Sequence, residues 1–444
     1  MDQTSNKQET TTKIIVLDDD PTGSQTVHSC LLLMRWDVET LRMGLADKAP
    51  IFFILTNTRA LTATKAASLT REVCQNLKVA LEAEGIEDFL VVSRSDSTLR
   101  GHYPVETDAI AAELGPFDAH FLVPAFFEGG RITRDSVHYL LVDGIETPVH
   151  KTEFAQDSVF GYQHSYLPDY VAEKTQGKIP AKAVTRFRLT DIRNNSLASL
   201  KQLQANTCCV VDGETQEDLD LFAADVLTAA SLGKRFLFRS AASILTSLAK
   251  LGKQPVEPEE MARYKPTANP GVVLVGSHVQ KTSQQLKKLL QESTVEGIEV
   301  DVVQLRCQPH RREDLLAEVL EKVAKTYQAN KTPVVYTSRK ELTFENIQER
   351  LDFGKVVSSF LMDVVKGLPE DISFLISKGG ITSNDVLSTG LGLTAAKLLG
   401  QILPGCSIVR TPPNHPQFPD LPIVLFPGNV GDVNGLVTVY RRLM

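Results

Sequence analysis

Three consecutive aspartates, Asp18, Asp19 and Asp20, follow the apolar run 14–17. Adjacent carboxylates repel one another unless a cation or a shared proton lies among them. They are therefore candidates for a general base that accepts the proton of a substrate hydroxyl, for a Mg²⁺ ligand, or for both. The alternative is structural, because Asp-Pro-Thr-Gly is favourable turn sequence and an aspartate can cap a helix. A cap needs only one carboxylate, so we favour a chemical role.

Arginines and hydroxyl side chains follow two further apolar runs. The segment 56–59 ends in Arg59, and the segment 94–101 contains Arg94, Asp96 and Arg100. A planar guanidinium can hold a carboxylate with two parallel hydrogen bonds, so these arginines are candidates for binding an acidic substrate. Each could instead be a surface or ion-pair residue, and Asp96 could serve only to orient Arg100.

In the second half of the chain, glycines and hydroxyl residues follow the apolar runs instead. These clusters are Gly276-Ser277-His278, Thr337-Ser338-Arg339, Lys378-Gly379-Gly380 and Pro427-Gly428-Asn429. Glycine lets the main chain approach closely, and successive amide N–H groups can hold phosphate oxygens. Turns from strand to helix often need glycine anyway, but clusters at several strand ends favour a nucleotide site. The two halves therefore indicate two ligands, one in each.

Short, continuously apolar runs alternate with segments of helical periodicity, which is typical of parallel strands covered by helices. Strands are expected at 14–17, 51–55, 89–92, 121–123, 208–211, 272–275, 300–303, 334–336, 374–376 and 423–426, and helices at 219–227, 315–323 and 353–365. Ligands of such sheets bind beyond the carboxyl ends of the strands. We predict an α/β fold with two domains, each a mostly parallel sheet flanked by helices, and an active site in the cleft between them.

The segment 253–270 carries four prolines, which discourage helix and strand alike. We place the domain boundary there, so the first domain covers 13–252 and the second covers 271–444. The segment 143–188 has weak periodicity and could be a lid or an irregular excursion.

The composition is that of a soluble globular protein, with 444 residues, 42% hydrophobic and 23% charged. A net charge of −7 gives no indication of nucleic-acid or membrane binding. The six cysteines form no C-x-x-C pair and are expected to be reduced thiols. The start of the chain is polar, is expected to be disordered and lacks the apolar core of a signal peptide, and no run is long enough to span a bilayer. We expect a cytoplasmic protein.

Several catalytic motifs are absent from the sequence. It has no G-x-x-x-x-G-K-[ST] phosphate loop, no H-E-x-x-H zinc pair and no G-x-S-x-G nucleophile turn. The segment 390–395 fits the G-x-G-x-x-[GA] dinucleotide pattern but does not follow an expected strand. A nicotinamide-dependent oxidoreductase is therefore a disfavoured alternative.

The motifs together resemble those of the four-carbon acid sugar kinases, in the same order along nearly the whole chain. Residues 19–23 match the family's D-D-x-T-G motif, 96–101 match D-S-T-x-R-G, and 57–59 are similar to its N-T-x-x-R element. In the second half the corresponding residues are Gly276-Ser277 with Thr282 and Gln285, Gly379-Gly380-Ile381-Thr382, and Gly428-Asn429-Val430-Gly431.

The resemblance implies a kinase that uses ATP and Mg²⁺ to phosphorylate the terminal hydroxyl of threonate, erythronate or 3-oxo-tetronate. The first domain would bind the acid sugar and the second the nucleotide; metal ligands are not assigned, and a homodimer is possible. The implied catalytic residues are Asp19 and Asp20, and the implied substrate-binding residues are Thr22, Arg59, Asp96, Ser97 and Arg100. The implied nucleotide-binding residues are Gly276, Ser277, Gly379, Gly380, Thr382 and Gly428.

Three positions depart from the family pattern. Ile381 stands where an acidic residue is usual, with Asp385 as a candidate replacement, and Asp18 and Pro21 replace a small and an apolar residue. These departures indicate a divergent branch of the family. They leave open the alternative of a non-catalytic ligand-binding or regulatory protein on the same scaffold.

Overall fold

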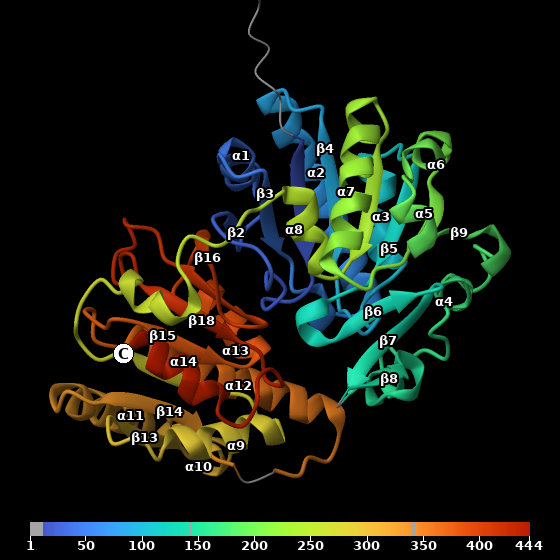
Figure 1. Cartoon of the computed structure of the whole chain (residues 1–444). Helices are drawn as coiled ribbons and strands as arrows, with labels where there is room; N and C mark the ends of the chain where they lie inside the picture. Colours follow the sequence, from blue (N-terminus) through green and yellow to red (C-terminus); the bar gives the residue numbers. More distant parts are fainter. Residues whose placement is uncertain (1–11, 143, 340–341) are drawn as a thin grey trace, which may run out of the picture. The chain divides into compact units, whose positions relative to one another are not determined.

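The computed structural model describes residues 12–142, 144–339 and 342–444 (Figure 1). The chain divides into two compact units, unit 1 (Met1–Gly252) and unit 2 (Lys253–Met444). Most of the polar start of the chain, residues 1–11, for which we expected disorder, lies outside the described residues.

Unit 1 contains one large sheet whose strand pairs are all parallel. Its strand order is β2-β3-β1-β4-β11-β5-β10-β9. These strands are β1 (Lys13–Asp18), β2 (Leu31–Leu33), β3 (Ile51–Leu55), β4 (Phe89–Arg94), β5 (Ala119–Val123), β9 (Thr185–Phe187), β10 (Thr207–Val211) and β11 (Phe236–Ser240). The central strands β1, β3 and β5 are buried at every residue, which is why they read as unbroken apolar runs.

Helices cover both faces of this sheet. The face that a connecting helix covers depends on the direction in which the chain moves along the sheet between the two strands it joins. The helices are α1 (Val38–Ala46), α2 (Ala63–Glu84), α3 (Val105–Leu114), α4 (Leu167–Lys174), α5 (Leu189–Arg193), α6 (Leu197–Gln202), α7 (Gln216–Ser231) and α8 (Ser243–Ala249). The chain moves along the sheet in one direction through α2 and α3, and back again through α7. Right-handed crossovers therefore place α7 on the face opposite α2 and α3, as Figure 1 shows.

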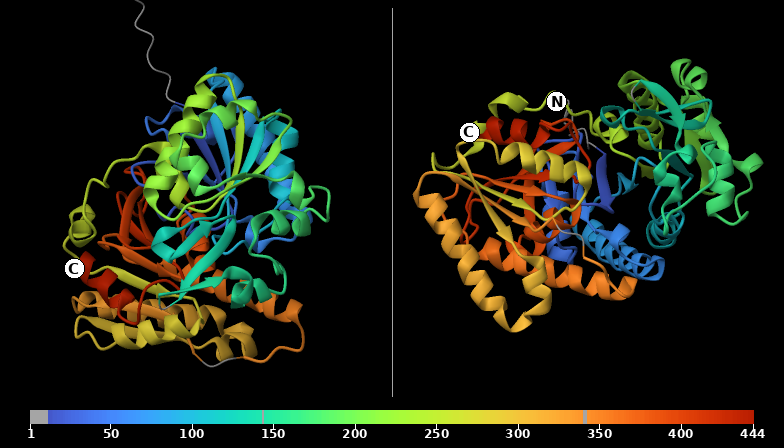
Figure 2. Two further views of the ribbon diagram at one scale, coloured as in Figure 1. Left: turned by 45° about the vertical axis from the view of Figure 1, so that its right-hand side comes forward. Right: turned by 90° about the horizontal axis from the view of Figure 1, so that it is seen from below.

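A second, antiparallel sheet of unit 1 stands apart from the main one (Figure 2). It consists of β6 (Arg131–Arg134), β7 (Val137–Val142) and β8 (Ile145–Pro148). The segment 143–188, which the sequence left undefined, contributes β8, α4 and β9 together with short 3₁₀ turns. Leu167, Tyr170 and Val171 of α4 are buried in a core shared with Leu99 and Val210, so this segment is packed structure.

Unit 2 has the strand order β13-β14-β12-β15-β18-β17-β16. The five strands β13 (Val295–Val300), β14 (Thr332–Thr337), β12 (Val272–Val275), β15 (Leu375–Lys378) and β18 (Pro422–Phe426) are parallel, whereas β17 (Cys406–Arg410) and β16 (Ala395–Leu403) are antiparallel. The helices are α9 (Gln280–Leu289), α10 (Val302–Cys307), α11 (Arg312–Gln328), α12 (Ile347–Lys366), α13 (Gly380–Asp385) and α14 (Gly435–Leu443). The long helices α11 and α12 pack together, as do α9 and α14 (Figure 2).

The predicted mostly parallel α/β architecture is confirmed, with several local differences. The strand expected at 300–303 is wrong, because β13 ends at Val300 and α10 begins after Asp301, whose carboxylate accepts hydrogen bonds from Val303 N and Gln304 N. Strand β13 is an outer strand of its sheet and only some of its residues are buried, so its sequence has no continuous apolar run.

Further differences concern proline and the strands that were not expected. Within the proline-rich segment 253–270 the helix Pro258–Tyr264 forms in 3₁₀ geometry, because Pro258 occupies its first turn, where no N–H is needed. Neither the antiparallel strands β6, β7, β8, β16 and β17 nor the short parallel strands β2, β9 and β11 were expected. In the described residues no helix is long and apolar enough to cross a membrane.

Candidate functional site

The residues singled out in unit 1 come together because three neighbouring parallel strands end side by side. In the sheet register Asp18 of β1 lies opposite Leu55 of β3 on one side and Arg94 of β4 on the other. The segments that follow these strands, 18–23, 56–59 and 94–101, therefore leave the same edge of the sheet. This is the edge at which ligands of parallel sheets bind.

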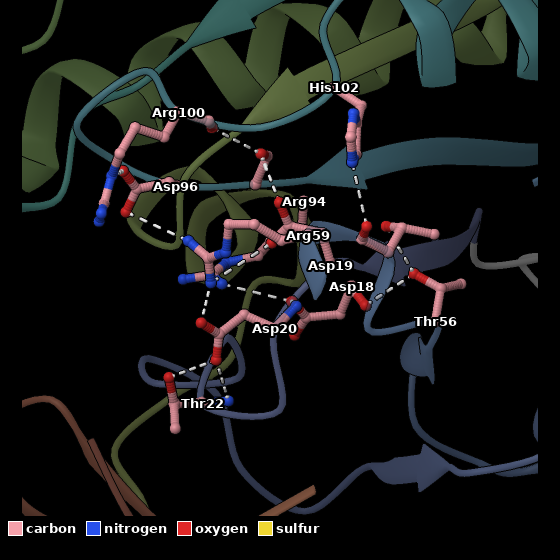
Figure 3. Close-up of polar contacts among 12 residues, drawn as sticks. Asp18, Asp19, Asp20, Thr22, Thr56, Arg59, Arg94, Asp96, Arg100 and His102 are labelled. Carbon is pink, nitrogen blue, oxygen red and sulfur yellow. Dashed lines mark hydrogen bonds and ion pairs between the residues drawn. The ribbon is translucent and has the colours of Figure 1, made fainter. Parts of the chain in front are cut away.

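Arg59 lies between two carboxylates and joins them in one chain of ion pairs (Figure 3). Its guanidinium forms an ion pair with Asp20 and lies 3.4 Å from Asp96, and Asp96 in turn lies 2.9 Å from Nε of Arg100. Burial opposes ionisation of Asp96, but Arg59 and Arg100 outweigh it and hold the pKa of Asp96 well below its usual range. The chain Asp20–Arg59–Asp96–Arg100 is thus a fixed row of alternating charges.

Asp19 and Asp20 differ in their exposure to solvent. The Asp19 side chain is 1% exposed, accepts a 2.7 Å hydrogen bond from Ser95 Oγ and lies 3.7 Å from Arg59. The Asp20 side chain is 24% exposed. Its Oδ1 also accepts from the N–H of Thr22 at 2.7 Å and from the Thr22 hydroxyl, so the turn expected from the sequence forms as well. Asp20 is the carboxylate that a ligand can reach.

Asp18 serves a different purpose, because it is buried against Arg94. The two side chains lie 3.3 Å apart, and Gly23 packs so closely on them that a Cβ there would lie 2.1 Å from Asp18 Oδ1. Burial raises the pKa of Asp18 to about 7, and the positive charge of Arg94 offsets this only in part. Arg94, a sequence candidate for binding substrate, is therefore occupied by an internal partner.

Each main-chain carbonyl group of the loop 96–100 forms a hydrogen bond with a side chain from elsewhere in unit 1. Arg239 donates to the carbonyls of Asp96 at 3.1 Å and Arg100 at 2.9 Å, and His138 Nε2 lies 2.7 Å from the carbonyl of Ser97. Tyr162 and Tyr170 donate to the carbonyls of Thr98 at 2.6 Å and Leu99 at 2.8 Å. Leu99 adopts a left-handed φ of 68°, which such support makes tolerable. Arg239, Tyr162 and Tyr170 were not singled out from the sequence, because nothing local marks them.

Glu106 of α3 is a further carboxyl group that the sequence analysis missed. It is buried beneath the site and accepts a 2.6 Å hydrogen bond from Thr58 Oγ1. Burial, reinforced by the nearby charge of Asp19, raises the pKa of Glu106 to about 7. No local pattern in the sequence marks Glu106, because its burial depends on how α3 packs in the fold.

In unit 2 four parallel strands also end side by side. In the register Val275 of β12 lies opposite Tyr336 of β14 and Lys378 of β15, and Lys378 lies opposite Phe426 of β18. The predicted nucleotide-binding residues Gly276, Ser277, Gly379, Gly380, Thr382 and Gly428 follow these ends. The sheet register therefore places the glycine clusters together at the carboxyl ends of these strands.

Contacts among these residues are close. Gly379 has a φ of 122°, and a Cβ there would lie 3.0 Å from Ser277 Cβ and 3.1 Å from Thr382 Oγ1, so only glycine fits. Thr282 Oγ1 donates to the Gly428 carbonyl at 2.9 Å and lies within hydrogen-bond distance of Ser277 Oγ at 3.1 Å. The residues from the three glycine clusters thus form one surface lined by main chain and hydroxyl groups.

Lys378 and Arg339 lie at these strand ends and form no ion pair with the described residues. Lys378 is fully buried, donates to the carbonyl of Pro427 and lies 3.7 Å from the centre of the Phe426 ring. Burial lowers the pKa of Lys378 to about 7. Arg339 donates to the carbonyls of Ser277 and Val275. Uncompensated positive charge beside exposed main chain suits an anionic ligand.

Ile381, which replaces an acidic residue of the family pattern, is 70% exposed. Its proposed substitute Asp385 accepts hydrogen bonds from Ser358 and from Asn384, so it is already partnered. The dinucleotide-like segment 390–395 precedes β16 and does not follow a strand. Among the described residues no group of three or more His, Cys, Asp and Glu side chains is placed to hold a metal ion.

Two family models match the chain and together cover most of it. A sugar-binding N-terminal domain model matches residues 14–248, and a nucleotide-binding C-terminal domain model matches residues 272–436. These two matches fall on the unit that carries the ion-pair chain and the unit that carries the glycine clusters, respectively.

The curated relatives are similar over less than half of their length. The chain is 29% identical over 223 residues to a D-erythronate kinase of Heliobacterium modesticaldum, which covers 47% of each chain. It is 28% identical over 184 residues to a D-threonate kinase of Bordetella bronchiseptica, which covers 39% of this chain and 43% of the relative.

Solved structures share the fold over nearly the whole chain. A protein of Salmonella typhimurium LT2 matches with a TM-score of 0.72 at 20% identity, covering 98% of this chain and 99% of the other. A Haemophilus influenzae protein matches with a TM-score of 0.68 at 19% identity, covering 97% and 100%. At this level of identity the likeness concerns the fold alone.

Proposed function

The chain belongs to the four-carbon acid sugar kinase family, and from this we propose that it transfers a phosphoryl group from ATP to the terminal hydroxyl of a four-carbon acid sugar. The substrate would be of the threonate, erythronate or 3-oxo-tetronate type. The observation that carries the proposal is the chain Asp20–Arg59–Asp96–Arg100 at the carboxyl edge of the sheet in unit 1. It supplies one reachable carboxylate for a hydroxyl and guanidinium groups for an acid.

In the proposed reaction Asp20 accepts a hydrogen bond from the reacting hydroxyl and takes its proton as the new O–P bond forms. The bond from the γ-phosphorus of ATP to its bridging oxygen breaks, and ADP leaves. Asp20 is the more exposed of the two aspartates, whereas Asp19 is buried and fixed by Ser95. Arg59, Asp96 and Arg100, with Thr22 and Ser97 beside them, would orient the sugar. Phosphoryl transfer demands mainly positioning and neutralisation of charge, which a rigid row of charges can supply.

We propose that unit 2 binds ATP at its glycine clusters. Main-chain and hydroxyl groups of Gly276, Ser277, Gly379, Gly380, Thr382 and Gly428 would hold the nucleotide. Lys378 and Arg339, which the described residues leave without an ion pair, would add positive charge near the phosphates. The transfer requires one molecule to bind both ligands and bring them within reacting distance.

Mg²⁺ fits this proposal as a companion of ATP. The described residues offer no group of three ligands, but Asp19 and Asp20 provide the hard oxygen atoms that the ion prefers. Mg²⁺ commonly binds through substrate phosphates, water and one or two carboxylates. Asp20 would be its protein ligand if it is not the base, and the ion would neutralise phosphate charge.

The proposal is tested by coupled detection of ADP across a panel of four-carbon sugar acids with ATP and Mg²⁺. We expect Asp20→Asn to lower kcat by at least about 100-fold, the scale of a lost general base, with nucleotide affinity retained. Asp88→Asn is the matched control, because Asp88 precedes β4 at the opposite end of the same sheet. Full turnover in both Asp19→Asn and Asp20→Asn would reject the proposed base.

A non-catalytic role is the second candidate, and the exposed Ile381 favours it because it removes an acidic group from the nucleotide side. Tight binding of a sugar acid or a nucleotide without ADP release across the panel would support this candidate. Wild-type protein that binds no adenine nucleotide at millimolar concentration would reject the kinase.

A further inference from the structure

Arg131 is a guanidinium of unit 1 that forms no ion pair with any acidic side chain the structure describes. It opens strand β6, its Nη1 donates to the Gly129 carbonyl, and its guanidinium lies 5.9 Å from the centre of the Phe126 ring. Its Nε is buried and has no hydrogen-bond partner, and the described residues form no ion pair with it. A buried guanidinium nitrogen without a hydrogen-bond partner lowers the free energy of unfolding, so such groups are rare in folded proteins.

The position of Arg131 places it beside the substrate loop. Burial lowers the pKa of Arg131, and the charges that act on it most are Asp96, Arg100 and Glu153. Thr133, two residues further on the same face of β6, lies 2.9 Å from His138, and His138 contacts the carbonyl of Ser97. Arg131 is therefore electrostatically close to the Arg100 end of the ion-pair chain.

The other arginines of the site are already occupied. Arg59 is paired with Asp20 and Asp96, Arg94 with Asp18, and Arg100 with Asp96. Arg239 is fully buried and uses its two terminal nitrogens on the carbonyls of Asp96 and Arg100. Arg131 forms no ion pair with the described residues and one side-chain hydrogen bond, to the Gly129 carbonyl, so most of its five N–H groups are unused.

We propose that Arg131 binds the carboxylate of the substrate, beside the ion pair of Arg100 with Asp96. The acid group would lie at the Arg100 end of the ion-pair chain and the reacting hydroxyl at the Asp20 end. This orientation makes Arg131 a specificity residue for acids over neutral sugars of equal length. The inference rests on the proposed function for the identity of the substrate.

The experiment compares binding of sugar acids by calorimetry, without turnover, to wild-type protein and to Arg131→Met. The panel holds polyhydroxy acids of three to six carbons, and an ATP analogue serves as the second ligand. We expect Arg131→Met to weaken acid binding at least about 10-fold, the scale of a lost charge-assisted pair, and to change ATP-analogue affinity less than about 2-fold. Arg131→Lys keeps the charge but loses the planar fork, so its loss should be smaller.

Arg134→Met is the matched control. Arg134 lies on the same strand but is 41% exposed and paired with Glu146 and Glu214. Unchanged acid affinity in Arg131→Met, or an equal loss in Arg134→Met, would overturn the inference, and so would a wild-type protein that binds none of the acids. Acid binding that depends on Arg131 but leads to no phosphate transfer would support the inference and reject the kinase proposal alone.

Discussion

The effect of replacing Asp18 with asparagine on the unfolding free energy should be more favourable at pH 8 than at pH 5. Asp18 is 1% exposed, and its Oδ2 has no hydrogen-bond partner among the described residues. Burial raises its pKa from 3.8 to about 7. The folded state therefore keeps a proton that the unfolded chain releases between these values. Its contribution to the unfolding free energy is complete below pH 3.8 and is lost as the pH rises through about 7.

The magnitude follows from the two pKa values of Asp18, folded and unfolded. A tenfold difference in proton affinity between the two states corresponds to about 1.4 kcal/mol. Integrating the proton linkage between pH 5 and pH 8 gives a loss of about 2–3 kcal/mol for a group that titrates at these pKa values. Asparagine does not titrate, so Asp18→Asn escapes this loss. The difference in unfolding free energy, variant minus wild type, should increase by that amount from pH 5 to pH 8.

The assay is denaturant unfolding followed by tryptophan fluorescence. The chain has one tryptophan, Trp36, which lies in unit 1 and so reports on that unit. Asp96→Asn is the matched control. Because the pKa of Asp96 is lowered in the folded state, the stability that Asp96 contributes is lost only on acidification below its unfolded pKa. The effect of Asp96→Asn on the unfolding free energy should therefore be constant between pH 5 and pH 8. A pH-independent effect of Asp18→Asn, or a larger gain at pH 5, would refute the reasoning.

Three further outcomes are expected. Gly23→Ala should lower the unfolding free energy by about 3 kcal/mol or more. The added Cβ would lie 2.1 Å from Asp18 Oδ1 and would break the buried ion pair of Asp18 with Arg94. A denaturation midpoint within error of the wild-type value would contradict this. ATP-analogue affinity should fall as the pH rises from 6 to 9, because the pKa of Lys378 is lowered to about 7 and the side chain loses its charge above that pH. Calorimetry should show that this pH dependence is abolished in Lys378→Met. Persistence of the pH dependence in the variant would count against a role of Lys378. Thiol alkylation of the folded protein should modify Cys307 alone, because the other five cysteines are buried, with mass spectrometry finding one adduct; rapid labelling of a second site would disagree.

The sequence was sufficient for the strands that position the site. Strands β1, β3 and β4 are buried on both faces, so their apolar runs are continuous, and parallel strands in one sheet must end at the same edge. This is why Asp20, Arg59 and Asp96 could be grouped from sequence alone. Strand β13 could not be located in the same way, because an edge strand buries only part of its length.

Only the tertiary structure decided which charged groups are free and which are occupied. Arg94 and Arg131 are the same residue type, yet one is paired with Asp18 and the other has no acidic partner among the described residues. The difference depends on contacts between residues far apart in the chain, as with Arg239, which holds the loop 96–100 from a strand more than a hundred residues away. Local sequence pattern determines where strands end, but the burial and pairing that set each group's charge and availability arise from long-range packing.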